Sequence, residues 1–410
     1  MSNTTTKREG AKFTWRVTRI RCKDFQITAT KGKQFTVDWG DGSGRETMTG
    51  TGVSEEVVHV YAAENEYTVK VSGTTADCLF TAIDVSSAYV TCLDVSRCIS
   101  LQRLRCYDNH LISLDLRSNK ALKKIDCSGN DITVLNLKNN KALQELNCSG
   151  DELNALDVSA NTALESLSCW SNSLKTLDIS ANSALSELHC SCNKLSKLDL
   201  TANPLLDILQ CSDNKLTTLD VSRHAKLYLL FCDRNKLTTL DLSANPALRL
   251  LHCEENKLMT LDLSANTALT KLQCDNNQIP YQDLYKILTT NPLRYKEIHS
   301  QSPIPQKVTV GEPVALIPSM IEGRVTFYRV HKRNAQASKS DYSIEAGAIT
   351  FHNSGTYKVI MTNEAILSDV DEYYELDVEK TCKHPKEEEC EFVRKEDFEI
   401  TAKFIAVKQR

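Results

Sequence analysis

Cysteine recurs in this 410-residue sequence at a fixed interval, and no other feature constrains the fold as strongly. Nine cysteines stand 21 residues apart without a break: Cys106, Cys127, Cys148, Cys169, Cys190, Cys211, Cys232, Cys253 and Cys274. The residues around them share the period and follow the consensus LxxLxCxxNxLxxLDLSxNxx. An earlier copy, with Phe80, Ile83 and Val85 at its apolar positions, brings the total to ten copies between residue 80 and about residue 289. A period of this length predicts stacked structural repeats.

Each copy is expected to contribute one short strand. Alternate side chains of a strand point to the same side, so the leucine and cysteine of LxC face inward while their neighbours face outward. Parallel strands stacked about 4.8 Å apart bury a continuous core that no single copy can bury. A 21-residue copy leaves too little chain for a full helix on the other side, so the LDLS segments are expected to be extended or tightly turned.

The consensus resembles a leucine-rich repeat. The predicted fold class is therefore mainly β: a leucine-rich repeat solenoid with a parallel β-sheet on its concave face and little helix, flanked by two small β-sandwich domains.

The cysteine row has two interpretations, as thiols for redox or metal chemistry or as small apolar side chains that fill a narrow core. Cysteines on neighbouring parallel strands are about 4.8 Å apart, which exceeds the roughly 3.5–4.5 Å between Cβ atoms in a disulfide. No CxxC pair occurs within the row. Because cysteine packs like a small hydrophobe, we expect buried free thiols, and we expect no metal and no cofactor.

An asparagine stands three residues after each cysteine, with one exception. The row comprises Asn109, Asn130, Asn172, Asn193, Asn214, Asn235, Asn256 and Asn277. A stacked row of amides can satisfy the backbone groups that are freed where the chain leaves each strand. Asp151 replaces the asparagine once and can only accept, which predicts a weaker repeat there. The Asp, Ser and Asn of LDLSxN predict turns on the outer face.

The outward positions of the strands are the candidate ligand-binding site. They include Tyr107, Trp170, His189, Ile208, Gln210, Leu229, Phe231, Asp233, Leu250, His252 and Glu254. Ile208, Leu229 and Leu250 share one position beside Phe231, which predicts a contiguous exposed apolar patch of the kind that marks interaction surfaces. The alternative is that the C-terminal domain covers this patch, or that it is simply tolerated. Trp170 and Tyr107 are either binding aromatics or ordinary surface.

Composition and motifs exclude several functions. The net charge of −4 and the pI of about 6.2 provide no basic surface for nucleic acid. Membrane insertion is not expected, because no stretch approaches about 20 apolar residues. The start, MSNTTTKREG, lacks the apolar region of a signal peptide. The sequence contains no HExxH, GxSxG or Walker motif, so we expect no enzymatic activity. We expect a cell-surface or secreted protein if an export signal has been removed, and a cytoplasmic one if the sequence is complete.

Two further domains flank the repeats. Residues 1–10 are an N-terminal tail, and short alternating runs over 11–79 predict a β-sandwich cap. Its DWGDGS segment, at residues 38–43, resembles the polycystic-kidney-disease-like fold. The repeats span residues 80–289, and the segment PYQDLYKIL at their end, residues 280–288, has helical spacing. A cap and linker follow over 290–305. Six or so strands over 306–380 predict an immunoglobulin-like sandwich. The extension 381–410 holds Cys382, Cys390 and the strand-like run ITAKFIAV, and the two cysteines can pair in an oxidising compartment.

Cysteine-bearing repeats between these two sandwiches resemble the internalin-type leucine-rich repeat proteins of bacterial surfaces. The resemblance implies a non-enzymatic recognition protein, with a protein or glycan ligand on the concave sheet and a role in adhesion or host contact. The alternative is a structural spacer or self-assembly module without a ligand of its own, in which the apolar patch mediates self-association.

Overall fold

The computed structural model describes residues 8–18, 22–291 and 293–297 continuously. In the C-terminal part it describes 306–310, 312–315, 320–321, 324–325, 327–332, 335–346, 348–362 and 400–407. The chain divides into two compact units, residues 1–214 and 215–410.

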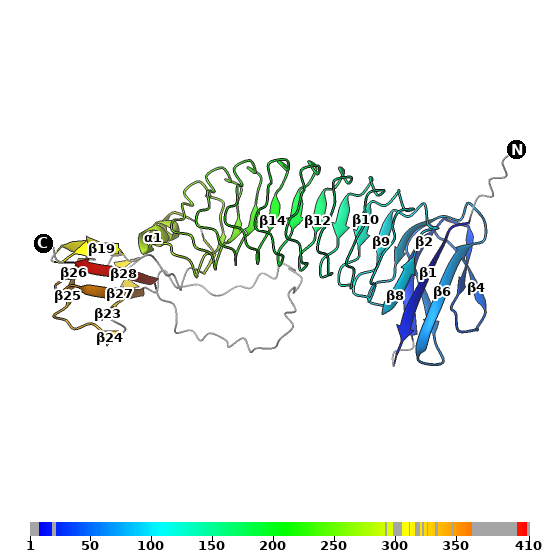
Figure 1. Cartoon of the computed structure of the whole chain (residues 1–410), viewed down its shortest axis with the longest axis horizontal. Helices are drawn as coiled ribbons and strands as arrows, with labels where there is room; N and C mark the ends of the chain where they lie inside the picture. The colour runs from blue at the N-terminus through cyan, green and yellow to red at the C-terminus, as the bar shows by residue number, and fades with distance from the viewer. Residues whose placement is uncertain are drawn as a thin grey trace. The chain divides into compact units, whose positions relative to one another are not determined.

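The first unit begins with two antiparallel groups of strands that enclose an aromatic core. One sheet has the order β4-β3-β6-β1-β8, with β1 (Gly10–Val17), β3 (Gln34–Asp38), β4 (Arg45–Thr49), β6 (Asn65–Gly73) and β8 (Val90–Asp94). Opposite it, β2 (Cys22–Ala29) pairs with β5 (Glu55–Val60) and β7 (Phe80–Asp84). Phe13 of β1 meets Phe25 of β2 edge to face, with ring centroids 5.2 Å apart. Figure 1 shows β1 and β6 side by side at the N-terminal end.

The parallel sheet of the repeats starts on the N-terminal strands. Strand β7 pairs antiparallel with β2 and parallel with β9, with Ile83 opposite Leu104, so the first repeat strand belongs to both structures. The parallel strands of this unit are β9 (Arg103–Arg105), β10 (Lys124–Asp126), β11 (Glu145–Asn147), β12 (Ser166–Ser168), β13 (Glu187–His189) and β14 (Ile208–Gln210). Neighbouring strands are related by a register of 21 residues.

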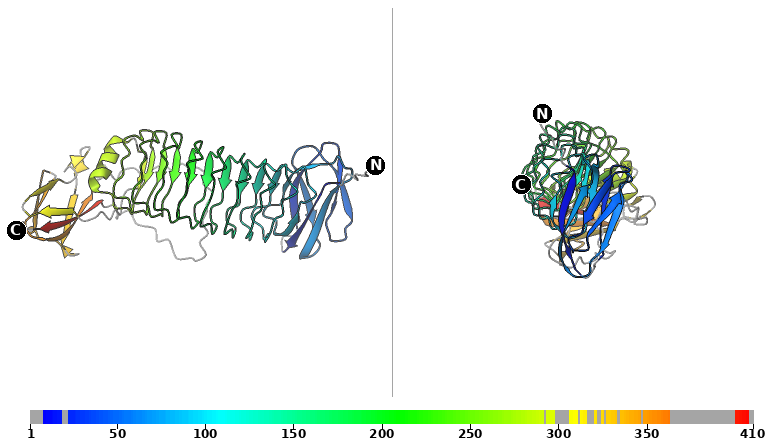
Figure 2. Two further views of the ribbon diagram at one scale, coloured as in Figure 1. Left: turned by 45° about the horizontal axis from the view of Figure 1, so that its top comes forward. Right: turned by 90° about the vertical axis from the view of Figure 1, so that its right-hand side faces the viewer.

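The second unit continues the same pattern. Its parallel strands are β15 (Leu229–Phe231), β16 (Leu250–His252), β17 (Lys271–Gln273) and β18 (Tyr295–Glu297). The middle residue of each strand from β10 to β17 is buried and the residues on either side are half-buried, as alternation requires. The return segments of the described repeats contain bends and turns without helix (Figure 2). The predicted parallel-sheet solenoid with little helix is confirmed.

The repeat cysteines are core residues. All nine are buried, each with an exposed fraction of 0%, and all are free thiols. Burial raises the pKa of Cys169 to about 12, and the same cause raises the pKa of the other repeat cysteines for which a shift is resolved. The thiols are therefore protonated at neutral pH and act as small apolar side chains. This confirms the interpretation of the cysteine row as core filling.

The asparagines that follow the cysteines satisfy the backbone where each strand ends. Asn193 Nδ2 donates to the carbonyl oxygens of Cys169 (3.0 Å) and Cys190 (3.2 Å). Asn193 Oδ1 accepts from the backbone N–H of Leu174 at 3.0 Å. The predicted amide ladder is thus confirmed, and each amide joins adjacent copies of the repeat.

A second asparagine row is also buried, which corrects one prediction. Asn119, Asn140, Asn161, Asn182 and Asn203 in the first unit, with Asn245 and Asn266 in the second, have an exposed fraction of 0%. Asn161 Nδ2 donates to the carbonyls of Asn140 (2.9 Å) and Leu137 (3.2 Å). Only the Asp and Ser of LDLSxN lie on the outer face as predicted, where the backbone N–H of Ser159 donates to Asp157 Oδ1 at 3.1 Å. His224 is buried in the asparagine position of its repeat.

A helix follows the last cysteine repeat of the second unit. It is α1 (Tyr281–Thr290), which confirms the helical spacing seen over 280–288, and its Leu284 and Ile287 are buried. Within the part of the chain that the structure describes, no helix combines the length and apolar character that a membrane span needs.

The C-terminal strands form two main sheets. One has the order β19-β28-β27-β23-β24 and the other β20-β26-β25, with the short pair β21 (Met320–Ile321) and β22 (Arg324–Val325) beside them in sequence. Their bounds are β19 (Gln306–Thr309), β20 (Pro313–Ala315), β23 (Phe327–Lys332), β24 (Ala335–Gln336), β25 (Tyr342–Glu345), β26 (Ala348–Phe351), β27 (Gly355–Thr362) and β28 (Ile400–Val407). The run ITAKFIAV is β28, which pairs antiparallel with β27 and parallel with β19. Cys382 and Cys390 lie outside the described residues.

Asp151 is the irregular member of the first asparagine row. It is 7% exposed and accepts the backbone N–H of Asn130 at 3.1 Å. Burial raises its pKa to about 7, with smaller contributions from the carboxylates of Asp131 and Asp126. The folded-state pKa lies above the unfolded value of about 4, so folding favours the protonated carboxyl of Asp151. The contribution of this group to the free energy of unfolding is therefore fully present below about pH 4 and is lost as the pH rises through 7.

Replacing Asp151 with asparagine is expected to raise the free energy of unfolding by about 1–2 kcal/mol at pH 8, because a neutral amide replaces a buried carboxylate. The gain should be smaller at pH 5, where the wild-type carboxyl is largely protonated. Thermal melting of both proteins at the two pH values measures this. Asp157→Asn is the matched control: hydrogen bonds from Ser159 lower the pKa of this exposed carboxyl, so the change should give no gain. An equal gain from Asp151→Asn at both pH values would contradict the assignment.

Candidate functional site

The candidate site is the side of the parallel strands that points away from the core, here called the sheet face. Each repeat presents two side chains on this face around its buried cysteine, one immediately before it and one immediately after it. In the repeat of Cys253 these are His252 and Glu254, which are half-buried while the cysteine is fully buried. Alternation along the strand places the two side chains on the same side of the sheet.

A left-handed residue fixes where each strand ends. The second residue after every repeat cysteine has a positive φ, between 48° and 65°: Asp108, Gly129, Gly150, Ser171, Cys192, Asp213, Arg234, Glu255 and Asn276. The backbone N–H of this residue donates to the next repeat, as in Arg234 to the carbonyl of Glu254 at 2.9 Å. The turn therefore holds the residue between it and the cysteine on the sheet face.

In the first unit, the polar side chains of the sheet face pair with one another from strand to strand. Lys124 forms an ion pair with Glu145 on the neighbouring strand. The hydroxyls of Ser149 and Ser168 lie 2.9 Å apart. These groups already have partners, so a ligand must compete with them for hydrogen bonds.

The predicted site residues of the first unit are spread along its sheet face. Tyr107 is 38% exposed, and Trp170, His189, Ile208 and Gln210 are half-buried. Burial lowers the pKa of His189, so its imidazole is neutral at pH 7. The structure brings three of these residues together, because Ile208 and Gln210 share β14 and Gln210 is opposite His189 of β13. Tyr107 and Trp170 belong to other repeats and do not join this group.

In the second unit, apolar side chains lie in register on two adjacent strands. Leu229 is opposite Leu250, and Phe231 is opposite His252. The rings of Phe231 and His252 stack with centroids 4.0 Å apart and an interplanar angle of 10°. Leu229, Leu250 and Phe231 are half-buried, as is Ile208 in the first unit, so the prediction of an exposed patch is corrected. Equivalent side chains on parallel strands are close enough to cover one another.

Three potential ligating groups converge beside this apolar row. One ligand atom each from Asp233, His252 and Glu254 lies within 4.8 Å of the other two. Asp233 is 4% exposed and pairs with Arg234 Nη2 at 3.0 Å. The sequence predicts that all three residues lie on the sheet face, but it was not used to predict that they form one group. The repeat period could have shown that two of them adjoin, because Asp233 and Glu254 hold equivalent positions 21 residues apart.

Burial dominates the electrostatics of this group. It raises the pKa of Glu254 to about 8, with further contributions from the carboxylates of Asp233 and Asp275. It lowers the pKa of His252 to about 3, assisted by the positive charges of Lys271 and Arg234. At neutral pH the imidazole is therefore neutral and Glu254 is largely protonated, which is how proteins avoid uncompensated buried charge.

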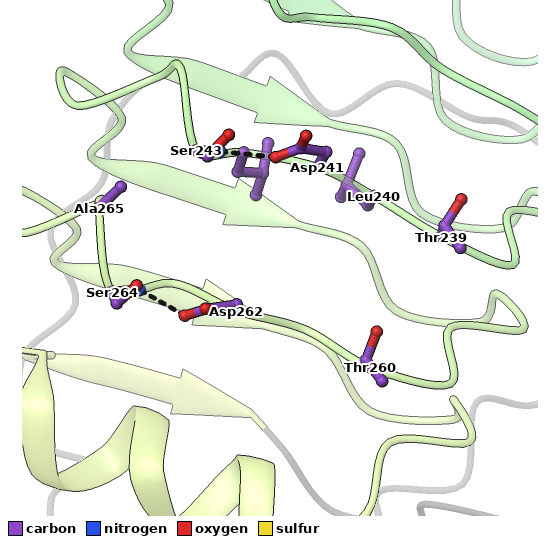
Figure 3. Close-up of a pocket in the computed structure, with 9 residues that line it drawn as sticks. Thr239, Leu240, Asp241, Ser243, Thr260, Asp262, Ser264 and Ala265 are labelled. Carbon is purple, nitrogen blue, oxygen red and sulfur yellow. Dashed lines mark hydrogen bonds between the residues drawn. The ribbon is translucent and has the colours of Figure 1, made fainter.

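The outer side of the repeats carries a cavity as well. It has a volume of about 270 Å³ and is lined by residues of two LDLS segments (Figure 3). Its carboxylates, Asp241 and Asp262, accept hydrogen bonds from the backbone N–H groups of Ser243 (2.9 Å) and Ser264 (3.0 Å). These bonds lower the pKa of both carboxyls. The two carboxylates are thus already hydrogen-bonded within their own turns. The cavity volume also lies below the roughly 300–1,000 Å³ of typical ligand pockets.

No protein-family model and no curated protein sequence matches the chain. Among solved structures, it is similar to the functional domain of InlJ from Listeria monocytogenes, which includes a cysteine ladder: identity is 19%, the match covers 80% of this chain and 90% of that one, and the TM-score is 0.38. It is also similar to the internalin InlF from Listeria monocytogenes, with 20% identity, coverage of 57% and 73%, and a TM-score of 0.49. A third similar structure is the plant peptide hormone receptor RGFR1 in complex with RGF2, with 21% identity, coverage of 52% and 40%, and a TM-score of 0.44.

The left-handed turn that positions Glu254 generates a stability prediction. Glu255 has a φ of 52°, a conformation that costs an L-residue with a side chain about 1 kcal/mol. Glu255→Gly is therefore expected to raise the free energy of unfolding by about 0.5 kcal/mol, after the entropic cost of glycine is subtracted. Urea unfolding measures this. Lys257→Gly, at an exposed position without a positive φ in the same repeat, should instead destabilise by about 0.5–1 kcal/mol. Equal destabilisation by both changes would contradict the role of the turn.

Proposed function

We propose that this chain is a non-enzymatic recognition protein that binds a protein ligand on its sheet face, which we predict to be concave. The observation that carries the proposal is the row formed by Leu229, Leu250 and Phe231 beside the acidic group of Asp233 and Glu254. An apolar centre with charged groups at its margin is the usual composition of a protein interface.

The rigidity of the strands supports binding. Amides such as Asn256, which donates to the carbonyls of Cys232 (3.0 Å) and Cys253 (3.1 Å), fix the backbone beneath the sheet face. The stack of Phe231 on His252 restricts both rings. A surface that is ordered before binding loses little conformational entropy on association, so more of the contact energy appears as affinity.

The type of ligand follows from the side chains of the row. Leucine side chains present no donor or acceptor for sugar hydroxyls, which favours a protein over a glycan at this position. A glycan ligand would instead use the aromatic side chains of the first unit, Tyr107 and Trp170, as stacking platforms. The sequence resemblance to internalin-type proteins favours adhesion or host contact at a bacterial cell surface as the setting of this binding.

Replacing Leu229 and Phe231 with serine should abolish protein binding. Polypeptide binders are selected from a displayed library against the full-length wild-type chain, and their affinities for wild-type and variant proteins are compared. We expect the double variant to weaken the dominant binders at least about 100-fold, as loss of central apolar anchors does at protein interfaces, while a cooperative melting transition shows that the variant is still folded.

Met259→Ser is the matched control, because Met259 is an exposed apolar residue (42%) in the same unit and outside the strands. Binding should be unchanged in this variant. If the dominant binders keep their affinity for the double variant, the sheet face of the second unit is not the binding surface. A concentration-dependent dimer in light scattering, lost in the double variant, would instead support the self-assembly alternative.

A further inference from the structure

We propose that Asp233, His252 and Glu254 form a binding site for a divalent transition-metal ion on the sheet face of the second unit. The proposal is independent of any protein ligand. It departs from the sequence prediction, which expected no metal.

The repeat geometry brings the three groups together. His252 and Glu254 flank the buried Cys253 and so point to the same side of one strand end. Asp233 occupies the position of Glu254 on the neighbouring repeat. Their ligand atoms lie within 4.8 Å of one another. Ligands about 2.0–2.2 Å from a tetrahedral zinc ion are about 3.3–3.6 Å apart, so closure around an ion requires side-chain movements of about 1 Å.

Buried polar atoms at this site point to a ligand. Within the described part of the chain, His252 Nε2 and Glu254 Oε2 are fully buried atoms that form no hydrogen bond. Most buried polar side-chain atoms have a partner, and an exception calls for an explanation such as an ion. His189 Nε2 is buried without a partner as well, but among the described residues it belongs to no group of converging ligand atoms, whereas His252 and Glu254 do. A bound cation would supply the missing partner for carboxylate and imidazole lone pairs.

The donor set determines the class of ion. One imidazole and two carboxylates suit zinc and related first-row ions, whereas calcium and magnesium prefer oxygen ligands alone. Three protein ligands leave a coordination position for water or for a group from a bound partner. The ring of Phe231 holds the imidazole plane, and Arg234 at 3.0 Å holds the Asp233 carboxylate, as outer-shell partners do at metal sites.

The surrounding charges permit a cation. Three carboxylates interact within the group, those of Asp233, Glu254 and Asp275. Two positive groups act on His252, namely Lys271 and Arg234. The carboxylates of Asp233 and Asp275 therefore match the two positive groups in number, and no excess of positive charge opposes a cation here. Lys271→Ala is expected to strengthen metal binding, because it removes a repelling charge.

The experiment is isothermal titration of the full-length chain, stripped with chelator and kept reduced, with Zn²⁺ as the probe. The wild-type chain should bind one equivalent at this site. His252→Gln and Glu254→Gln should each weaken that equivalent by at least about 100-fold, the upper end of the loss seen for outer-shell partners. Melting temperatures measured without metal show whether each variant is folded.

His189→Gln is the matched control, since His189 stands before Cys190 as His252 stands before Cys253. It should bind the same number of equivalents as the wild type. The proposal is overturned if the wild-type chain binds no Zn²⁺, or if His252→Gln and Glu254→Gln bind as many equivalents with the same affinity. Because the titration uses the metal alone, its failure leaves the proposed protein binding standing, and failure of the binder selection leaves the metal site standing.

Discussion

Stacking of identical positions at the spacing of parallel strands is the constraint on which this structure depends. Every side chain of a repeat has the equivalent residue of the next repeat as its neighbour, about 4.8 Å away. A residue that fits one repeat must therefore fit against its own copy. Cysteine meets this requirement in the core because a protonated thiol is small and apolar. Asparagine meets it at the strand ends because its amide donates to two repeats at once, as Asn193 does to Cys169 and Cys190.

The same constraint produces the chemistry of the sheet face. Where neighbouring repeats carry small polar residues on this face, as with Ser149 and Ser168, the side chains pair with one another and a ligand must compete for their hydrogen bonds. Where equivalent positions carry acids, as in Asp233 and Glu254, the two carboxyl groups are held close together, and burial with the neighbouring Asp233 carboxylate raises the pKa of Glu254 to about 8. The apolar row of Leu229 and Leu250 and the group of Asp233, His252 and Glu254 thus arise from one cause, and they adjoin because both follow the same strands.

Much of the repeat region is predictable from the sequence, since a fixed period converts sequence position into spatial neighbourhood. The strands, the buried cysteines and the first asparagine row follow from it. The burial of Asn161 and its equivalents does not follow from the period. The pattern LDLSxN fits both an exposed and a buried asparagine, and only the path of the return segment decides between these two positions. The half-burial of Leu229 was missed for a related reason: an outward side chain is covered by its neighbours. The partners of β28 are distant in sequence and carry no periodic signal. The polycystic-kidney-disease-like and immunoglobulin-like assignments remain predictions.

The most direct test of the account is site-resolved thiol labelling of the folded protein, with each cysteine read by peptide mapping. Cys22 and Cys92, which are exposed, should react in native buffer. The nine repeat cysteines should stay unmodified until denaturant unfolds the chain, because their thiols are buried and protonated. Modification of most of the nine in protein that still melts at its normal temperature would contradict the account, since the sheet face and the core would then have to be exchanged.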